Sequence, residues 1–301
     1  MNNEVIMISQ LNELMTQRRW SQTQVARAIG KSPAVISQYL QGKYPGDVSS
    51  LESDIAALIN REAEKDKGKR LSVSFVRTYT AARCLEVIKL AHLDCDINVI
   101  FGDAGMGKTM IMRQYAAENR TAILLEADPG YTARVVLEEL CAKLGLNRRG
   151  NMHELSDAII NALRDSGRVL LIDEAENLPL RALEVIRRIH DKAGIGVVLA
   201  GMPRLIINLK GKRGELKQLY SRVGFALAMG DVLPREDIDA IAASVLDDAQ
   251  EPAVGDALFS ASKGNARRLF KLLRGVHRHS QLNGVPVDAG AVRKFSEMLI
   301  N

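Results

Sequence analysis

The stretch GDAGMGKT, residues 102–109, decides the fold of this 301-residue chain. Glycine lacks a Cβ, so Gly102, Gly105 and Gly107 let backbone N–H groups surround an anion without steric conflict. The stretch fits the pattern GxxxxGK[ST], and the apolar run INVIF (97–101) precedes it. A strand, this loop and a helix together form a phosphate-binding unit. The sequence therefore predicts a loop that holds the phosphates of ATP or a close relative.

Each polar residue of this loop has an expected role. The helix that follows directs its positive N-terminus at the anion. Lys108 is expected to neutralise the β- and γ-phosphates, and the Thr109 hydroxyl to bind Mg²⁺. Gly102, Gly105 and Gly107 are expected to contact the nucleotide through their backbone.

A second motif, RVLLIDEAENL (168–178), is an apolar run that ends in two carboxylates. Asp173 is expected to hold Mg²⁺ together with Thr109. Glu174 is expected to act as the general base that polarises an attacking water. For Glu176 we favour an acid at the start of a helical turn, where negative charge is stabilising.

Apolar runs alternate with helical patterns from about residue 71 to residue 230, which predicts a parallel sheet covered by helices. The expected strands are 97–101, 121–127, 168–173, 195–201 and 224–229. After residue 231 only helical patterns remain. The fold class is thus α/β, with domains at 1–62, 73–230 and 231–301 and a charged linker at 63–72.

The N-terminal stretch SQTQVARAIGKSPAVISQYLQG (21–42) has the pattern of a helix-turn-helix. Gly30 ends the first helix, and Ser32 with Pro33 begins the second. Lys31, Ser37 and Gln38 are the expected DNA contacts. The alternative is a small helical bundle used for protein contact.

Two basic segments are further candidates for phosphate contact. In residues 263–280, cationic side chains share one helix face, and residues 204–218 are basic with two central glycines. A solvated charged face is the alternative for the first segment. The DNA contacts predicted from these segments are Arg204, Lys210, Lys212, Arg213, Lys271 and Arg274.

Composition adds a few bounds. The net charge is +5, and the three cysteines show no CxxC spacing, so they are expected to be reduced thiols. No apolar run has the length of a membrane span, and no membrane partner is expected. We expect a cytoplasmic protein of a bacterial host cell, encoded by a phage or a transposon.

Together these motifs resemble the AAA+ ATPases. The resemblance implies that Arg222, in LYSRVGF, is an arginine finger that completes a neighbouring subunit's site, and that Arg267, in GNAR, contacts the nucleotide from a helical lid. Where that family places a polar sensor after the fourth strand, this chain has Met202. A thioether is a poor hydrogen-bonding group, so slow ATP hydrolysis is expected.

The order of motifs most resembles the AAA+ ATPases that capture target DNA in phage transposition. That resemblance implies ATP-dependent, largely sequence-nonspecific binding of double-stranded DNA, DNA-stimulated hydrolysis, a homo-oligomer in the form of a helical filament or ring, and a transposase partner. Two alternatives stay open. One is an ATPase of the helicase-loader type, and the other is a nucleotide-gated helix-turn-helix transcription regulator.

Overall fold

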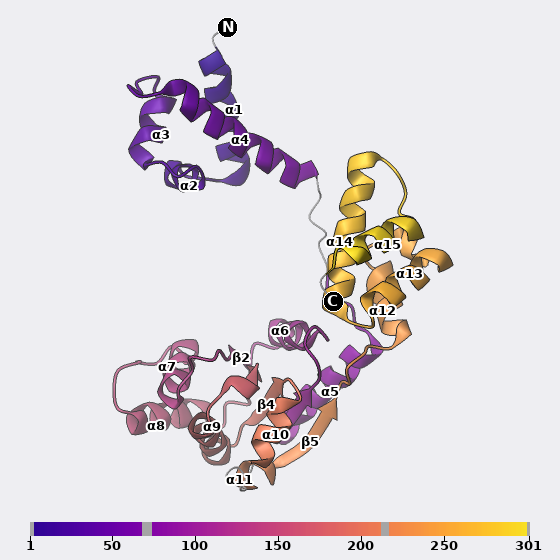
Figure 1. The fold of residues 1–301 in the computed structure, drawn as a ribbon. Helices are drawn as coiled ribbons and strands as arrows, with labels where there is room; N and C mark the ends of the chain where they lie inside the picture. Colours follow the sequence, from indigo (N-terminus) through magenta and orange to yellow (C-terminus); the bar gives the residue numbers. More distant parts are fainter. Residues whose placement is uncertain (1–2, 68–73, 212–216, 300–301) are drawn as a thin grey trace. The chain divides into compact units, whose positions relative to one another are not determined.

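The computed structural model describes residues 3–67, 74–211 and 217–299. The chain forms two compact units (Figure 1). The first consists mainly of Met1–Leu71, and the second mainly of Ser72–His277 and Pro286–Asn301.

The N-terminal unit is a bundle of four helices with its own core, indigo to violet in Figure 1. At the start of its second helix, Ser21 and Gln24 form a reciprocal capping box. At the start of the third, the Ser32 hydroxyl accepts a hydrogen bond from the Val35 N–H. The predicted helix-turn-helix is therefore confirmed. The helices are α1 (Asn3–Arg18), α2 (Gln22–Ala28), α3 (Pro33–Leu40) and α4 (Val48–Lys67).

Two details of this unit do not follow from the sequence pattern. Tyr39 is fully buried in the core and donates its hydroxyl to Glu52 at 3.1 Å, whereas Leu40 is only half-buried. Residues 63–67 of the expected linker continue α4, and residues 68–72 lie outside the described part of the chain. The helix thus extends further along the chain than composition indicates.

The second unit is built on a five-stranded parallel sheet in the order β2-β3-β4-β1-β5. All five predicted strands are present. Because β1 and β3 both neighbour β4, the loops that follow these three strands meet at one edge of the sheet, where open α/β sheets bind ligands. The strands are β1 (Ile97–Phe101), β2 (Ala122–Glu126), β3 (Val169–Asp173), β4 (Gly196–Gly201) and β5 (Val223–Ala228).

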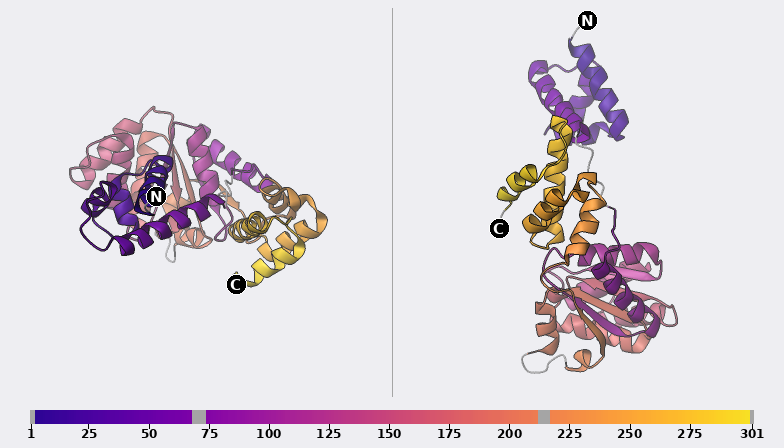
Figure 2. Two further views of the ribbon diagram at one scale, coloured as in Figure 1. Left: turned by 90° about the horizontal axis from the view of Figure 1, so that it is seen from above. Right: turned by 90° about the vertical axis from the view of Figure 1, so that its right-hand side faces the viewer.

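Helices cover both faces of this sheet (Figure 2). One face packs against α5 (Tyr79–Asp94) and α6 (Lys108–Glu118). The main apolar core fills the other face, beneath a second set of helices. That set comprises α7 (Ala133–Leu144), α8 (Met152–Leu163), α9 (Leu180–Ala193), α10 (Arg204–Lys210) and α11 (Lys217–Tyr220).

Strand β5 lies at the edge of the sheet and is largely exposed, with Phe225 51% accessible, although its sequence predicts a buried strand. Its pairing with β1 contains a bulge. The buried Asn98 side chain accepts a hydrogen bond from the Phe225 N–H at 2.9 Å and donates one to the Val87 carbonyl at 2.9 Å. Asn98 thus satisfies the backbone amide that the bulge leaves unpaired.

The C-terminal segment is helical, as predicted, and we call it the lid. Its buried Asp237 carboxylate accepts hydrogen bonds from the N–H groups of Tyr79, at 3.0 Å, and Thr80, at 3.1 Å, and so caps α5. The lid consists of α12 (Arg235–Ala243), η2 (Asp247–Gln250), α13 (Pro252–Ser262), α14 (Ala266–Asn283) and α15 (Ala289–Glu297). None of the helices in the described part of the chain is both long and apolar enough to cross a bilayer.

Candidate nucleotide-binding site

The loop between β1 and α6 has the open backbone that its glycines predict. Gly105 and Gly107 have φ values of +84° and +94°, a region that favours glycine. At Gly102, an added Cβ would lie 2.9 Å from the Cβ of Met229. No side chain of the described residues caps the start of α6, so its first N–H groups face the loop interior. The loop therefore offers backbone donors to an anion.

Lys108 lies folded over this loop. Its ammonium group donates hydrogen bonds to the carbonyls of Gly102, at 2.6 Å, and Asp103, at 2.7 Å. Burial lowers the pKa of Lys108, and the carboxylates of Glu176 and Asp173 oppose that shift. Phosphate oxygens can replace the two carbonyls as partners and would also compensate the buried positive charge.

Asp173, at the end of β3, provides the feature that a metal ion requires. Its carboxyl group is buried, and Oδ1 accepts a hydrogen bond from the Glu174 N–H at 3.0 Å. Oδ2 is buried without a hydrogen-bond partner among the described residues. Asp173 and Thr109 line the same cavity. A carboxylate oxygen and a hydroxyl that line one cavity are oxygen donors of the kind that Mg²⁺ prefers, so these residues fit the expected ion.

Glu174 is held by a short chain of hydrogen bonds. It has a left-handed backbone with a φ of +52°, and its Oε2 accepts a hydrogen bond from Asn177 Nδ2 at 3.2 Å. Asn177 Oδ1 in turn accepts one from Arg204 Nη2 at 3.3 Å. Sequence patterns did not identify Asn177, because its role depends on how the turn after β3 packs against α10.

Four more cationic side chains line the cavity that contains Lys108 and Asp173. Arg267 is there, as the family resemblance implies. The other three, Arg204, Lys271 and Arg274, are residues that we predicted as DNA contacts from sequence. The structure therefore places them around the phosphate-binding loop. Of the remaining predicted DNA contacts in these segments, Lys210 is exposed at the end of α10, and Lys212 and Arg213 lie outside the described residues.

The lid contacts the phosphate-binding loop directly. Asn265 Nδ2 donates a hydrogen bond to the Ala104 carbonyl at 2.8 Å, and the Arg267 N–H donates one to the Gly105 carbonyl at 3.1 Å. The fit is close, because a Cβ added at Gly105 would lie 2.5 Å from Asn265 Oδ1. The lid arginine is thereby held beside the loop.

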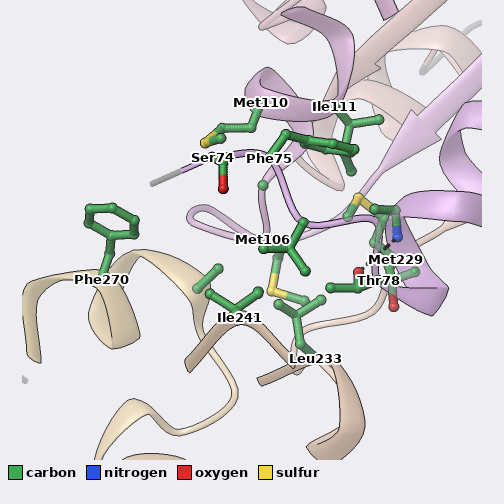
Figure 3. Close-up of a pocket in the computed structure, with 15 residues that line it drawn as sticks. Ser74, Phe75, Thr78, Met106, Met110, Ile111, Met229, Leu233, Ile241 and Phe270 are labelled. Carbon is green, nitrogen blue, oxygen red and sulfur yellow. Dashed lines mark hydrogen bonds between the residues drawn. The ribbon is translucent and has the colours of Figure 1, made fainter. Parts of the chain in front are cut away.

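An apolar pocket adjoins the cationic cavity (Figure 3). The two share Met106, Gly107, Met110, Ala266 and Phe270. Sequence patterns did not reveal this pocket, because its wall comes from segments far apart in the chain. The rest of its lining is Ser74, Phe75, Val76, Thr78, Thr80, Ala81, Ile111, Met229, Leu233 and Ile241. The site thus combines a region suited to phosphates with one suited to a flat apolar ring.

Two family positions lie apart from this arrangement. Met202 is 42% exposed at the rim of the cavity. Arg222 is not part of the cavity lining. Its guanidinium donates hydrogen bonds to Asp191 Oδ1 at 2.6 Å and to the Gln218 carbonyl at 2.8 Å, with 37% of the side chain exposed. Glu215, an acid near Arg222 in the sequence that is an alternative local partner for it, lies outside the described residues.

The predicted DNA-reading residues lie on the N-terminal bundle. Gln38 is exposed and Ser37 half-buried on α3. Lys31, in the turn before α3, forms an exposed ion pair with Asp54 at 3.2 Å. Exposed ion pairs are weak, so Lys31 stays available for a phosphate contact.

Comparisons with known proteins agree with this geometry. A family model described as an AAA domain matches residues 92–209, and one described as a helix-turn-helix matches residues 11–47. The chain is 29% identical to the ATP-dependent target DNA activator B of Escherichia phage Mu over 77% of this chain and 75% of that protein. It is 27% identical to the Mu-like prophage FluMu DNA transposition protein B of Haemophilus influenzae, over 72% and 77%.

Among solved structures, the Aeropyrum pernix ORC2 protein, in its ADPNP–ADP complexes, has a similar fold. The TM-score is 0.58, with 17% sequence identity over 77% of this chain and 72% of that one. At that identity the likeness concerns the fold alone. Taken with the motifs and the site, these findings show a chain in which residues 92–209 match an AAA domain and residues 11–47 match a helix-turn-helix, and which resembles the target DNA activator B of phage Mu.

Proposed function

We propose that this protein binds and hydrolyses ATP with Mg²⁺ and uses ATP binding to assemble on double-stranded target DNA for a transposase. The observation that carries the proposal is the composite site. An open phosphate loop, an unpartnered Asp173 oxygen, a set of cations and an apolar pocket adjoin one another. Each part matches one part of a magnesium-bound purine triphosphate.

Different residues would bind different parts of the ligand. The purine ring would occupy the apolar pocket, between Phe75 and Phe270. The triphosphate would lie along the loop, with Lys108 exchanging its two carbonyl partners for phosphate oxygens. Thr109 and Asp173 would hold Mg²⁺, which neutralises phosphate charge when bound.

For hydrolysis, Glu174 would take a proton from the attacking water. Arg267 and Lys108 would stabilise the charge that builds up on the phosphate oxygens. We reassign Arg204, Lys271 and Arg274 to the same task, because they line the cavity. Met202 offers no strong hydrogen bond at the rim, so turnover is expected to be slow and stimulated by DNA.

Arg222 would act on a neighbouring copy of the chain. It lies outside its own cavity, and its hydrogen-bond partners among the described residues are the Asp191 carboxylate and the Gln218 carbonyl. An exposed ion pair contributes about 0.2–1 kcal/mol, so Arg222 can leave Asp191 at little cost. The protein would then form a helical filament or ring with ATP between subunits, and hydrolysis would loosen it.

DNA would be bound mainly through its phosphates and largely without sequence preference. The residues proposed for this are Lys210 on α10 and Lys31, Ser37 and Gln38 in the N-terminal bundle. The transposase would receive the DNA held in this way. We place the activity in the cytoplasm of a bacterial host, because the relatives named above are phage and prophage proteins.

Binding of fluorescent duplexes tests the proposal. Two unrelated duplexes should bind with nearly equal affinity in Mg–ATP, weakly in ADP, and with steep loss of affinity as salt rises. Lys108→Ala should remove the ATP effect, whereas Lys89→Ala, an exposed lysine on α5, should keep it. A strong preference for single-stranded DNA would favour a helicase loader. Tight binding to one short sequence without ATP turnover would favour a transcription regulator.

A further inference from the structure

Glu176 lies in an unexpected place for a charged side chain. Its pattern in the sequence favours a surface acid at the start of a turn, and it does belong to the short helix η1 (Ala175–Asn177) after β3. Yet Glu176 is only 9% exposed and lines the cationic cavity that contains Lys108 and Asp173. Its Oε2 is buried without a hydrogen-bond partner among the described residues.

The carboxylate covers the end of β4. A Cβ added at Gly201, the last residue of β4, would overlap Glu176 Oε2. Because β4 lies between β1 and β3, this point is between the phosphate-binding loop and Asp173. The next residue, Met202, is 42% exposed. Glu176 therefore brings a polar group to a strand end that supplies none of its own.

A hydrogen bond to α10 fixes the turn that carries Glu176. The backbone carbonyl of Glu176 accepts this bond from Asn208 Nδ2 at 3.3 Å. The charged side chains around the same cavity are Lys108, Asp173, Glu174, Arg204, Arg267, Lys271 and Arg274. Among the carboxylates that oppose the lowering of the Lys108 pKa by burial, Glu176 is the largest contributor. An oxygen buried in this position without a partner is costly unless a ligand or water completes it.

We propose that Glu176 accepts a hydrogen bond from the water that attacks the γ-phosphate, and so orients it. This inference rests on the ATP hydrolysis proposed above. One O–H bond of the water breaks and its proton passes to Glu174. The water oxygen bonds to the γ-phosphorus while the bond from that phosphorus to the β,γ-bridging oxygen breaks and releases ADP. Glu176 keeps its own protonation state and fixes the direction of attack.

Steady-state ATP hydrolysis by matched variants tests this role. Glu176→Leu should lower kcat by about 100-fold with KM changed less than about threefold, because a positioned water is lost but the nucleotide is still held. Glu176→Gln should lower kcat by about tenfold or less, since an amide oxygen also accepts a hydrogen bond. Glu174→Gln should abolish turnover. Glu86→Leu, at an exposed position on α5, controls for the substitution itself.

Thermal unfolding separates positioning from a structural role. Glu176→Leu should unfold no earlier than the wild type, because it removes a buried carboxylate oxygen that has no hydrogen-bond partner among the described residues. If that variant does not fold, Gly201→Ala provides the same test, since its methyl group displaces the carboxylate.

Wild-type rates in both Glu176→Leu and Gly201→Ala would overturn the inference. So would a Glu176→Gln variant as inactive as Glu174→Gln, because the charge and not the hydrogen bond would then be needed. A wild-type protein that binds ATP without hydrolysing it would instead refute the ATPase activity under the proposed function.

Discussion

Asn177 holds the Glu174 carboxylate through a hydrogen bond of 3.2 Å and is itself held by Arg204. This hydrogen bond restrains the Glu174 side chain in one position, so a movement of the carboxylate toward an attacking water would have to break it. A single hydrogen bond to a charged group contributes about 1.5–3 kcal/mol, enough to hold the side chain in that position most of the time. Under the proposed function, the basal rate of hydrolysis would then depend on Asn177 as well as on Glu174.

Asn177→Ala should therefore raise DNA-independent ATP hydrolysis, by about three- to tenfold, because the Glu174 carboxylate is released. Phosphate release in the absence of DNA measures the effect. Asn147→Ala, at an exposed position after α7, is the control. A rate equal to or below the wild-type rate would mean that Asn177 supports Glu174 in its active position instead.

Among the individual residues of the site, contiguous sequence motifs predicted the phosphate-binding loop and Asp173 but missed Glu176 and the apolar pocket. The phosphate-binding loop and Asp173 could be predicted, because a few adjacent residues determine both the backbone geometry and the charge at these positions. Glu176 was assigned to a helix start because sequence position does not show that Gly201 leaves a space beside it. The apolar pocket could not be predicted either, since Phe75, Ile241 and Phe270 meet only in the folded chain.

Between elements, the contact of the lid with the phosphate-binding loop depends on Gly105. Gly105→Ala should weaken ATP binding at least about tenfold, because the added Cβ would push against Asn265 and move Arg267 away. Isothermal titration calorimetry measures the affinity. Gly145→Ala is a matched control, since Gly145 also has a positive φ but an added Cβ there meets nothing. Equal affinities for the two variants would mean that lid contact does not contribute to ATP binding.

Arg222, just before β5, gives a second prediction between elements. Arg222→Ala and Lys108→Ala should each be inactive alone. When they are mixed on DNA, hydrolysis should partly recover, because some interfaces then join an intact Arg222 to an intact phosphate-binding loop. Asp191→Asn, which removes the carboxylate that Arg222 shares with Arg187, should remain active. Full activity of Arg222→Ala at concentrations where subunits stay apart would contradict a shared site.

The bounds of the five strands were predictable to within a residue or two, and the surroundings of the strands were not. Alternating apolar runs and helical patterns identify each strand of the sheet. They cannot tell a central strand from an edge strand, and β5, with its exposed Phe225, is at the edge. The spacing of the basic residues on α14 likewise predicted that they share one helix face. It did not predict that Lys271 and Arg274 line the cationic cavity, because this depends on how the lid packs against the phosphate-binding loop.

For the whole molecule, assembly of several copies would couple the ATPase unit to DNA binding. A nucleotide that completes the interface between copies stabilises the assembled form in proportion to its affinity for that form. Many weak phosphate contacts along an oligomer would then add up to stable DNA binding that no single copy provides. Hydrolysis would remove the γ-phosphate contact and return the copies to solution.

Electron microscopy of the protein on long duplex DNA tests this central proposal most directly. The account predicts regular assemblies on DNA with Mg–ATP, persistent ones with Glu174→Gln, and none with ADP or with Lys108→Ala. Assemblies that form equally well without nucleotide, or bare DNA in the presence of Glu174→Gln and Mg–ATP, would contradict it.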